Sequence, residues 1–304
     1  MKTKYLTLLK RISTKSFKKR WQIYLARINF TDLIFNDFEN IKFEPVLITD
    51  SNRFFADPFI FKNNDGCLNI IYEDYSYFKY GKISMSTFDQ NFKLIASKEL
   101  LDIGSHLSYP NVFVQNGKTY IMPESSKEGN LYCFEFDFKN SALINKKLII
   151  ANTPLLDSTI LFHNGKYWLF ATHRGPESNS KLYIYHADQW DGPYTAHQQN
   201  PVKNTKVACR PAGNFLVSNG EIYRPSQNNQ NYYGESITIN KIITLNENEF
   251  HEEPFKLITP PKNTKNNYGI HTINISDGVI VIDGLKRVFA PFKQIEILFS
   301  KIFK

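Results

Sequence analysis

The sequence predicts an all-β fold, a five-bladed β-propeller with an amphipathic helix at each end of the chain. One sequence pattern recurs five times: an apolar and aromatic run, a tight turn that ends in glycine, and a second aromatic-rich run. The turns recur about every fifty residues, which is roughly the length of one four-stranded propeller blade. An all-β sandwich whose hairpins are similar by coincidence is the alternative. The turn glycines are Gly66, Gly117, Gly165, Gly220 and Gly278.

Each copy of this sequence pattern has the properties of a β-hairpin. Asn-Gly or Asp-Gly at the turn supplies the positive φ angles that a two-residue primed turn needs. β-branched and aromatic residues flank the turn, as a pleated and buried surface prefers. We expect one propeller domain over residues 32–290, with a short fifth blade that begins near residue 267. The first four blades are expected near 54–86, 105–150, 154–206 and 207–258.

The first 31 residues carry the excess positive charge of the chain. They hold nine Lys or Arg and no acidic residue, whereas the remainder has 28 basic and 29 acidic residues. Apolar side chains such as Phe17, Trp21 and Ile28 recur there at helical spacing. This predicts a basic amphipathic helix over 1–31, which suits an anionic membrane surface. A helix packed across the propeller with solvated lysines is the alternative. A second such helix is expected over 291–304.

Composition limits the cellular compartment and the classes of binding partner that we expect. The three cysteines are far apart and show no disulfide framework or zinc spacing, which favours a reducing compartment. No apolar run of signal-peptide type follows the first lysines. Because the basic excess is confined to the N-terminal segment, we expect no nucleic-acid partner. We therefore expect a cytoplasmic protein that can contact the inner membrane face. We expect no metal and no cofactor, although calcium in the channel stays open.

Candidate functional residues occupy matched places in the repeat. Asp57, Tyr109 and Asp157 lie eight or nine residues before their turn glycine, and Glu73 and Glu124 lie seven residues after theirs. An acid in an otherwise apolar strand is costly unless it is paired or used, so pairing with an arginine is the alternative to function. Because first strands line the channel of a propeller, these side chains are expected to meet at one mouth. The other expected substrate-binding residues are His106, Arg174, Arg210, Arg224, Gln227, Tyr233 and His271.

An ordered set of short motifs spans about residues 54 to 240. They are Phe55-Ala-Asp-Pro-Phe59, His106-Leu-Ser-Tyr-Pro110, Met122-Pro-Glu-Ser125, Leu156-Asp-Ser-Thr159, Tyr167-Trp-Leu-Phe170, Gly192-Pro-Tyr-Thr-Ala-His197, Asn200-Pro-Val202, Arg210-Pro-Ala-Gly213, Tyr223-Arg-Pro-Ser-Gln227 and Tyr233-Gly234. The set resembles the propeller domain at the N-terminus of plant glucosamine inositolphosphorylceramide transferase. Less closely, it resembles the five-bladed glycosidases that cleave arabinan, xylan and fructan. The plant protein carries a separate glycosyltransferase domain after its propeller, which we expect a chain of 304 residues to lack.

The resemblance to the glycosidases implies roles for the carboxyl groups. Asp57 falls at the position of a base or nucleophile, and Glu124 or Glu73 would donate a proton. Asp157 would orient a sugar hydroxyl or shift the pKa of a neighbouring acid. Such chemistry needs one protonated and one ionised carboxyl group. It also requires that Asp57 and Asp157 meet around the axis and are not each sealed against a separate ion-pair partner.

The arginines depart from the hydrolase pattern. Arg174, Arg210 and Arg224 are more than a neutral sugar needs, and guanidinium groups suit phosphate or carboxylate, so we expect an anionic or phosphorylated sugar. Ion pairs between blades are the alternative. The leading hypothesis is an enzyme of bacterial-type surface-polysaccharide or lipid-linked glycan synthesis that transfers a glycosyl group. The alternatives are a glycoside hydrolase of furanosidase type and a non-catalytic carbohydrate-binding propeller.

Overall fold

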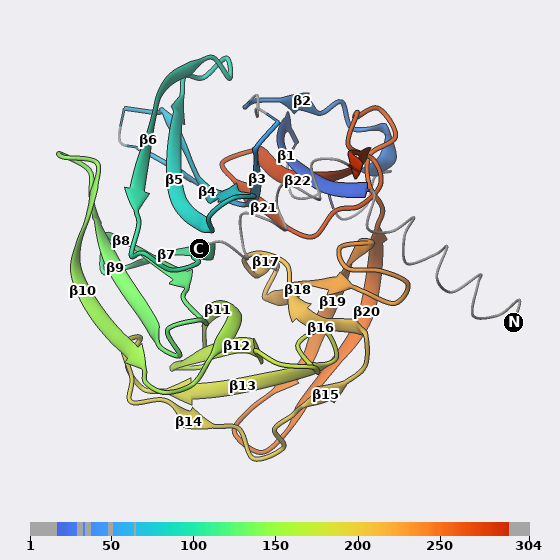
Figure 1. Cartoon of the computed structure of the whole chain (residues 1–304). Helices are drawn as coiled ribbons and strands as arrows, with labels where there is room; N and C mark the ends of the chain where they lie inside the picture. Colours follow the sequence, from blue (N-terminus) through green and yellow to red (C-terminus); the bar gives the residue numbers. More distant parts are fainter. Residues whose placement is uncertain (1–16, 29–32, 34–37, 48–50, 64, 292–304) are drawn as a thin grey trace, which may run out of the picture.

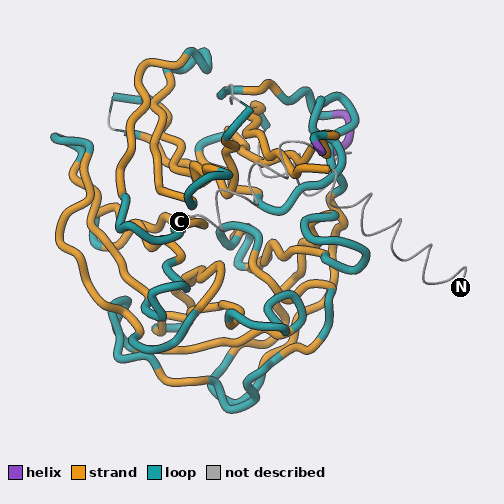
Figure 2. The backbone as a smooth tube through the Cα atoms, in the orientation of Figure 1, coloured by secondary structure: helices purple, strands orange, loops and turns teal. Residues whose placement is uncertain are grey.

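The computed structural model describes the chain except for residues 1–16, 29–32, 34–37, 48–50, 64 and 292–304. Five antiparallel sheets stand around a central axis as the blades of a propeller (Figure 1). Strands dominate the described residues, and helix is limited there to very short segments (Figure 2). None of the described helices is long and apolar enough to cross a membrane. The predicted five-bladed all-β propeller is confirmed.

Four blades are built from consecutive segments of the chain. Blade 1 contains β3 (Arg53–Lys62), β4 (Leu68–Ser76), β5 (Gly81–Phe88) and β6 (Leu94–Leu101). Blade 2 contains β7 (Ser108–Gln115), β8 (Lys118–Glu124), β9 (Leu131–Asp137) and β10 (Ala142–Ile150). Blade 3 contains β11 (Leu155–His163), β12 (Lys166–His173), β13 (Lys181–Ala187), β14 (Thr195–Ala196) and β15 (Lys203–Asn204). Blade 4 contains β16 (Val207–Pro211), β17 (Leu216–Ser218), β18 (Glu221–Asn228), β19 (Ser236–Leu245) and β20 (Phe250–Ile258).

The fifth blade joins the two ends of the described chain. Its strand order is β2-β1-β22-β21, so the N-terminal strands complete a sheet that the C-terminal hairpin begins. β1 pairs with β22 over its whole length, from Phe17 opposite Phe289 to Arg27 opposite Val279. The blade that looks short in the sequence is therefore filled by the start of the chain. The bounds are β21 (Ile273–Ser276), β22 (Val279–Phe289), β1 (Phe17–Arg27) and β2 (Glu44–Pro45).

The expected N-terminal helix over 1–31 is wrong where the structure describes that segment, because 17–27 form β1. Four consecutive residues of this strand, 23–26, are buried, which indicates burial on both faces. Tyr24 packs in a cluster with Ile237 of blade 4, and Leu25 packs in a cluster with Ile70 of blade 1. A helix with one apolar face cannot fill both clusters or pair the edge of β22. Residues 1–16 and 292–304, which carry the remaining helix expectations, lie outside the described residues.

The turns of the axial hairpins have the predicted geometry. Asn116, Asn164, Asn219 and Asp277 adopt φ angles of 51°, 51°, 51° and 48°, and the glycine after each of them is also at positive φ. Two consecutive residues at positive φ define the type I′ turn, whose twist matches that of the flanking strands. All these turns lie at the same end of the propeller, because each connects the first strand of a blade to the second. The opposite end holds the starts of the first strands.

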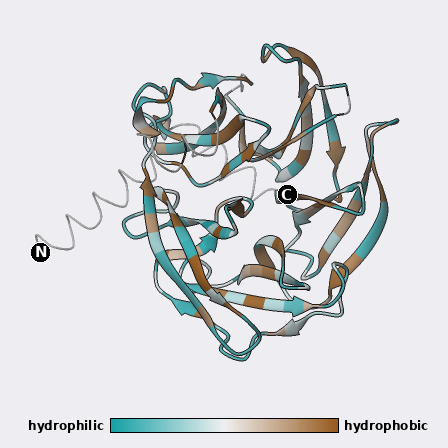
Figure 3. Cartoon of the chain, turned by 180° about the vertical axis from the view of Figure 1, so that it is seen from behind, coloured by the Kyte–Doolittle hydropathy of each residue, from teal (hydrophilic) through white to brown (hydrophobic). Residues whose placement is uncertain are grey.

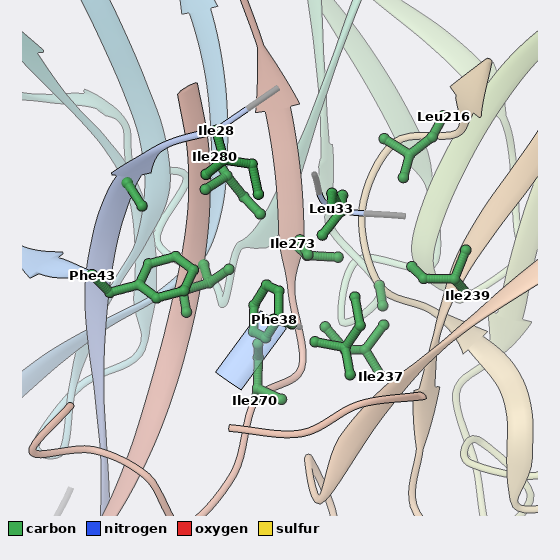
Figure 4. Close-up of a cluster of buried hydrophobic side chains, with 14 of the residues drawn as sticks. Ile28, Leu33, Phe38, Phe43, Leu216, Ile237, Ile239, Ile270, Ile273 and Ile280 are labelled. Carbon is green, nitrogen blue, oxygen red and sulfur yellow. The ribbon is translucent and has the colours of Figure 1, made fainter. Parts of the chain in front are cut away.

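The core is divided among the gaps between neighbouring blades. Apolar and polar stretches alternate along the strands and are spread around the whole ring (Figure 3). The cluster between blades 4 and 5 includes Ile237 and Ile239 of β19, Ile273 of β21, and Phe38, which lies in a short 3-10 helix at Phe38–Asn40 (Figure 4). Each of these four side chains is at most 3% exposed. Packing of each sheet on both neighbours fixes the blade angles and brings the innermost strands together at the axis.

Candidate active site

Asp57, Tyr109 and Asp157 share one backbone conformation at matched places. Their φ angles are 50°, 40° and 50°, and each lies where the pairing of the first and second strands of its blade shifts register. A β-bulge of this kind turns a side chain away from the ordinary alternation of a strand. Positive φ in a residue other than glycine is strained by about 1–3 kcal/mol and is concentrated at functional sites. The repeat alignment of these three residues is confirmed. In blade 4 the residue at positive φ within the corresponding register shift is Ala208.

Asp57 is held by neighbours from blades 2 and 5. Its Oδ1 accepts a hydrogen bond of 2.9 Å from Thr272 Oγ1 and lies 3.4 Å from His271 Nε2, while its Oδ2 accepts a longer bond of 3.3 Å from the Tyr109 amide. Burial raises the pKa of Asp57 to about 6; His271 opposes this rise, and the nearby carboxylates of Asp157 and Asp283 add to it. Asp57 therefore remains an ionised carboxylate at neutral pH, and its Oδ2 is the less engaged oxygen.

His271 lies in a polar cluster that the sequence predicted only in part. Its Nδ1 contacts Asp283 Oδ2 at 2.5 Å, but the direction is that of an ion pair rather than a well-aligned hydrogen bond. Burial works to lower the pKa of His271, and the carboxylates of Asp283 and Asp57 outweigh burial and raise it. The ring also stacks on Trp21 at 3.9 Å between centroids. His271 is 2% exposed, so it contacts Asp57 from the protein interior and not from the solvent side.

Asp283 is a functional-site residue that the sequence analysis missed. It is fully buried, and its carboxylate accepts hydrogen bonds from the amides of Asp57, His271 and Thr272 at 3.1, 2.9 and 3.0 Å. The available signal was an acid that directly follows the apolar run Val279-Ile-Val-Ile282. It was overlooked because it lies five residues after its turn glycine instead of seven.

Three of these groups could together hold a metal ion. Ligand atoms of Asp57, His271 and Asp283 lie within 4.8 Å of one another. However, Asp283 already accepts three backbone hydrogen bonds, and the two ring nitrogens of His271 already contact the carboxylates of Asp57 and Asp283. The polar atoms of these three side chains therefore already have partners within the protein without a metal ion.

Asp157 is locked by two side chains from blade 4. The Arg210 guanidinium forms a two-pronged ion pair with it, with Nη2 at 3.3 Å from Oδ1 and Nε in a closer contact with Oδ2. Gln227 Nε2 donates to the same Oδ2 at 3.0 Å. Asp57 is 5% exposed and has a separate partner in His271, so the expectation that the two acids are not each enclosed with a partner of their own is not met. Asp157 itself is 2% exposed and is sealed against Arg210. This arrangement fits a fixed negative charge and leaves little capacity for proton transfer.

Glu124 ends the second strand of blade 2 and Glu73 lies inside the second strand of blade 1, each next to the bulge of its blade. Glu124 accepts hydrogen bonds from Ser126 Oγ at 2.8 Å and from the Asp157 amide at 3.3 Å. Burial raises its pKa to about 8; the Asp157 carboxylate adds to the rise and Arg210 opposes it. Burial, and then the charges of Asp57 and Glu124, also raise the pKa of Glu73 well above its usual range. Glu124, with a pKa of about 8, is therefore protonated at neutral pH.

His106 lies over Glu73 at the outer side of this cluster. Its Nδ1 accepts the Gly81 amide proton at 3.0 Å, which leaves the proton on Nε2, 3.6 Å from Glu73 Oε1. A side chain at Gly81 would collide with Glu73, because a Cβ there would lie 2.4 Å from Oε1. Burial lowers the pKa of His106 to about 4, and the cations Lys127, Arg174 and Arg210 contribute. The imidazole is neutral and 23% exposed.

The remaining predicted residues are distributed between the mouth and the interior. Tyr233 is partly exposed, and the Arg210 guanidinium lies 5.3 Å from the centre of its ring. Arg174 is exposed immediately beyond β12. Tyr109 is fully buried, and its hydroxyl bonds Thr159 Oγ1 at 2.8 Å and the Gly213 amide at 2.7 Å, so it points down the axis rather than into the mouth.

Arg224 lies inside blade 4 instead of at the mouth. All three guanidinium nitrogens are engaged, with Glu252 at 2.8 and 2.5 Å and with the carbonyls of Ala208 and Cys209. The side chain is 1% exposed. Lys203 of blade 3 also contacts Glu252, at 2.6 Å. Arg224 is thus committed to an ion pair within blade 4, and it is Lys203 that connects this pair to blade 3.

Two sizeable cavities lie away from the axial carboxyl groups. One of about 700 Å³ is lined by residues such as Ala26, Ile41 and Phe92, and one of about 560 Å³ by residues such as Val46, Tyr72 and Asp74. Both lie where the outer strands of blades 5 and 1 meet. Neither contains a predicted site residue, so chemistry and not volume identifies the axial mouth as the candidate site.

Comparison with known proteins shows the family to which the chain belongs. The model of a family described as glucosamine inositolphosphorylceramide transferase 1, N-terminal, matches residues 46–277. The chain is 31% identical over 213 residues to glucosamine inositolphosphorylceramide transferase 1 of Oryza sativa subsp. japonica. It is 33% identical over 216 residues to the protein of the same name from Arabidopsis thaliana. Each alignment covers 68% of this chain but only 28% of the relative.

Solved structures with the same architecture include glycoside hydrolases. An exo-β-1,3-galactanase from Clostridium thermocellum superposes with a TM-score of 0.56 at 12% identity, covering 80% of this chain and 63% of that one. A thermostable family-43 glycoside hydrolase superposes with a TM-score of 0.52 at 16% identity, covering 66% and 76%. At such low identity the likeness concerns the fold alone. With its family match over most of the propeller, the chain belongs to the family of the N-terminal region of glucosamine inositolphosphorylceramide transferase 1.

Proposed function

We propose that this protein transfers a glycosyl group at the axial mouth, with Asp57 as the base and Glu124 as the acid. The observation that carries the proposal is that these two buried carboxyl groups have different partners: Asp57 lies beside His271 and Thr272 and has a pKa raised to about 6, and Glu124 accepts the Asp157 amide and has a pKa raised to about 8. Two carboxyl groups whose environments push their pKa values apart form an acid–base pair near neutral pH. Burial is the main reason that Glu124 keeps its proton, and the charge of Asp157, which Arg210 fixes in place, adds to this effect.

The reaction follows from these protonation states. The bond from the anomeric carbon to the leaving oxygen breaks, and its electron pair and the Glu124 proton go to that oxygen. The acceptor hydroxyl forms a new bond to the anomeric carbon and gives its proton to Asp57. Solvent then returns Glu124 and Asp57 to their starting states. The carboxylates of Asp57 and Asp157 stabilise the positive charge that develops on the sugar in such a transition state.

The relatives and the neighbouring structures support carbohydrate chemistry from two sides. The plant relatives are named as transferases, and the propellers of the same fold are named as glycoside hydrolases. The same pair of carboxyl groups performs hydrolysis when water replaces the acceptor hydroxyl. A non-catalytic sugar-binding role is the second candidate. It is favoured by the sealed Asp157–Arg210 pair, and it is compatible with a chain that spans 28% of its relatives.

The test compares Asp57→Asn, Glu124→Gln and, as a matched control, the exposed Glu128→Gln. Purified proteins are assayed for glycosyl release from aryl glycosides and for transfer from activated sugars to oligosaccharide acceptors. We expect Asp57→Asn to lower turnover about 100-fold or more on every substrate. Glu124→Gln should do so only with poor leaving groups, because a nitrophenolate departs without a proton. Glu128→Gln should behave like the wild type.

Three outcomes are informative. Release of free sugar without transfer would assign the hydrolase activity. Sugar binding by a stably folded wild type that turns over neither class of substrate would support the binding role instead. Turnover that survives in both Asp57→Asn and Glu124→Gln would overturn the proposed acid–base pair.

A further inference from the structure

We propose that the paired ends of β1 and β22 form a docking tip that binds an anionic membrane surface beside the axial mouth. The helix over 1–31 that was expected to make such a contact is replaced by a strand at 17–27, so the contact needs a different basis. The inference concerns where the protein docks, and it does not rest on the proposed function. The docking tip consists of Phe17, Lys19, Lys286, Arg287 and Phe289.

The docking tip lies on the same side of the propeller as the axial mouth. β22 begins at the hairpin turn, passes Asp283 in the candidate site and continues to Phe289. At about 3.3 Å per residue, Phe289 lies roughly 20 Å beyond Asp283 in the direction away from the turns. β1 runs beside β22 in the opposite direction and places Phe17 opposite Phe289 (Figure 1). The two strands therefore extend past the level of the carboxyl groups together.

Lys19 connects the docking tip to the candidate site. Its Nζ lies 5.0 Å from the centre of the Tyr233 ring. The Tyr233 ring meets the His271 ring edge to face, with 5.3 Å between their centres, and His271 contacts Asp57. A surface that binds the docking tip is therefore separated from the mouth by a single aromatic side chain.

Like charges face each other across the two strands of the docking tip. Lys19 is directly opposite Arg287, and Arg20 is directly opposite Lys286. Such cross-strand neighbours destabilise a sheet. Among the residues that the structure describes, no ion pair joins Lys19, Lys286 or Arg287 to a carboxylate. Binding of an anionic surface would relieve this repulsion, which the fold by itself leaves in place.

Aromatic rings take the place of carboxylates around Arg287. Its guanidinium carbon lies 4.7 Å from the centre of the Phe17 ring and 5.2 Å from that of Tyr268, and Nη1 donates to the Tyr268 hydroxyl at 3.3 Å. Phe17 also meets Phe289 edge to face, with 5.4 Å between the ring centres. Phe289 is 66% exposed. The docking tip thus presents an exposed phenyl ring among cations.

This combination favours a lipid surface over a soluble polyanion. The interface of a bilayer takes up aromatic side chains at the boundary of head groups and acyl chains, and its anionic lipids attract lysine and arginine. A double-stranded nucleic acid or an acidic peptide offers charge to the cations but no apolar layer to Phe289. Docking at the tip would turn the axial mouth toward the lipid head groups.

Co-sedimentation of the full chain with vesicles tests the docking tip. The vesicles contain phosphatidylcholine alone or with about 30% phosphatidylserine, and the variant is Lys19→Gln/Lys286→Gln. The matched control, Lys93→Gln/Lys139→Gln, removes two exposed lysines from turns at the opposite end of the propeller. Each cation near an anionic surface contributes about fivefold to binding, so the tip variant should bind about 25-fold more weakly. The control should differ from the wild type by less than about twofold, and about 0.5 M salt should remove the effect of the tip variant.

Tryptophan fluorescence shows which end of the protein meets the lipid. Phe289→Trp places an indole on the docking tip. Phe162→Trp places one at a similarly exposed position, 59% against 66%, near the turn after β11 at the opposite end. Brominated lipids quench an indole that enters the bilayer interface. We expect more quenching than in the wild type for Phe289→Trp and no more than in the wild type for Phe162→Trp.

Two results would overturn the docking tip. One is equal weakening in the two double variants or equal quenching of the two introduced indoles, even if the vesicles bind elsewhere on the chain. The other is binding of polyglutamate or duplex RNA through the same lysines without binding of anionic vesicles, which would assign the tip to a soluble polyanion. The acid–base proposal fails separately, if turnover of soluble aryl glycosides survives in Asp57→Asn and Glu124→Gln.

Discussion

At the scale of single residues, the axial site shows how one fold keeps several buried carboxyl groups in different states. Asp157 is compensated by an arginine, Asp57 by a histidine and a hydroxyl, and Asp283 by three backbone amides. Glu73 and Glu124 have no basic side chain in contact of comparable strength; burial raises the pKa of both, and it keeps Glu124, with a pKa of about 8, protonated at neutral pH. The same cost of burial is therefore resolved in two ways, by pairing and by neutralisation.

The raised pKa of Glu124 predicts a pH-dependent loss of stability. Between the ordinary glutamate range and about pH 8 the folded protein holds a proton that the unfolded chain releases, so stability falls as pH rises through this window and is level above it. Glu124→Gln cannot ionise. Relative to the wild type, its urea midpoint should therefore rise between pH 5 and pH 8.5, as measured by tryptophan fluorescence. A constant difference between the two proteins over this range would contradict the protonated state of Glu124.

At the scale of strands, blade 4 differs from the other blades in how its first strand is held. β16 and β17 are separate segments, and the bulge at Ala208 is clamped by Arg224, which bonds the Ala208 and Cys209 carbonyls. Those carbonyls directly precede Arg210, the partner of Asp157. Arg224 therefore positions the residue that fixes a charge in the site, although it is itself enclosed in the blade.

Breaking the buried pair should be costly. Arg224→Met leaves Glu252 without its main partner, and we expect a loss of about 3–5 kcal/mol in the free energy of unfolding. Glu252→Gln should also destabilise, and the double variant should show a coupling of at least about 1 kcal/mol, measured by urea denaturation. Arg174→Gln, an exposed arginine, should change stability by less than about 0.5 kcal/mol. Equal effects of Arg224→Met and Arg174→Gln would contradict the enclosed position of Arg224.

At the scale of the whole molecule, the ring is closed by pairing between the two ends of the described chain. β1 covers the edge of β22 and supplies side chains to the clusters on both sides of blade 5. Asp283 and His271 belong to this blade, and both hold Asp57 of blade 1. The strand pairing that closes the propeller therefore also holds the residues of the candidate site together.

Removal of β1 should consequently prevent both the closure of the propeller and the assembly of the candidate site. A protein that lacks residues 1–27 exposes the β22 edge and leaves cavities beside blades 1 and 4, so we expect aggregation or loss of the cooperative unfolding transition. A protein that lacks only residues 1–16 retains every pairing of β1 and should unfold cooperatively. Circular dichroism melting and size-exclusion chromatography distinguish the two. A soluble monomer with a cooperative melt after the larger deletion would contradict closure by β1.

The sequence by itself determined what is local and repeated. The Asn-Gly and Asp-Gly turns determined the hairpins, and their spacing determined the number of blades. Acids in apolar strands marked Asp57 and Asp157 as unusual, and matched places in the repeat marked Glu73 and Glu124. Only the tertiary structure decided where the first described strand belongs, because the pattern around Trp21 and Tyr24 fits a helix until the edge of β22 and two packed clusters require a strand. It also decided which arginine serves which acid. Ion-pair partners such as Arg224 and Glu252 are set by distances between strands, and no spacing along the chain records them.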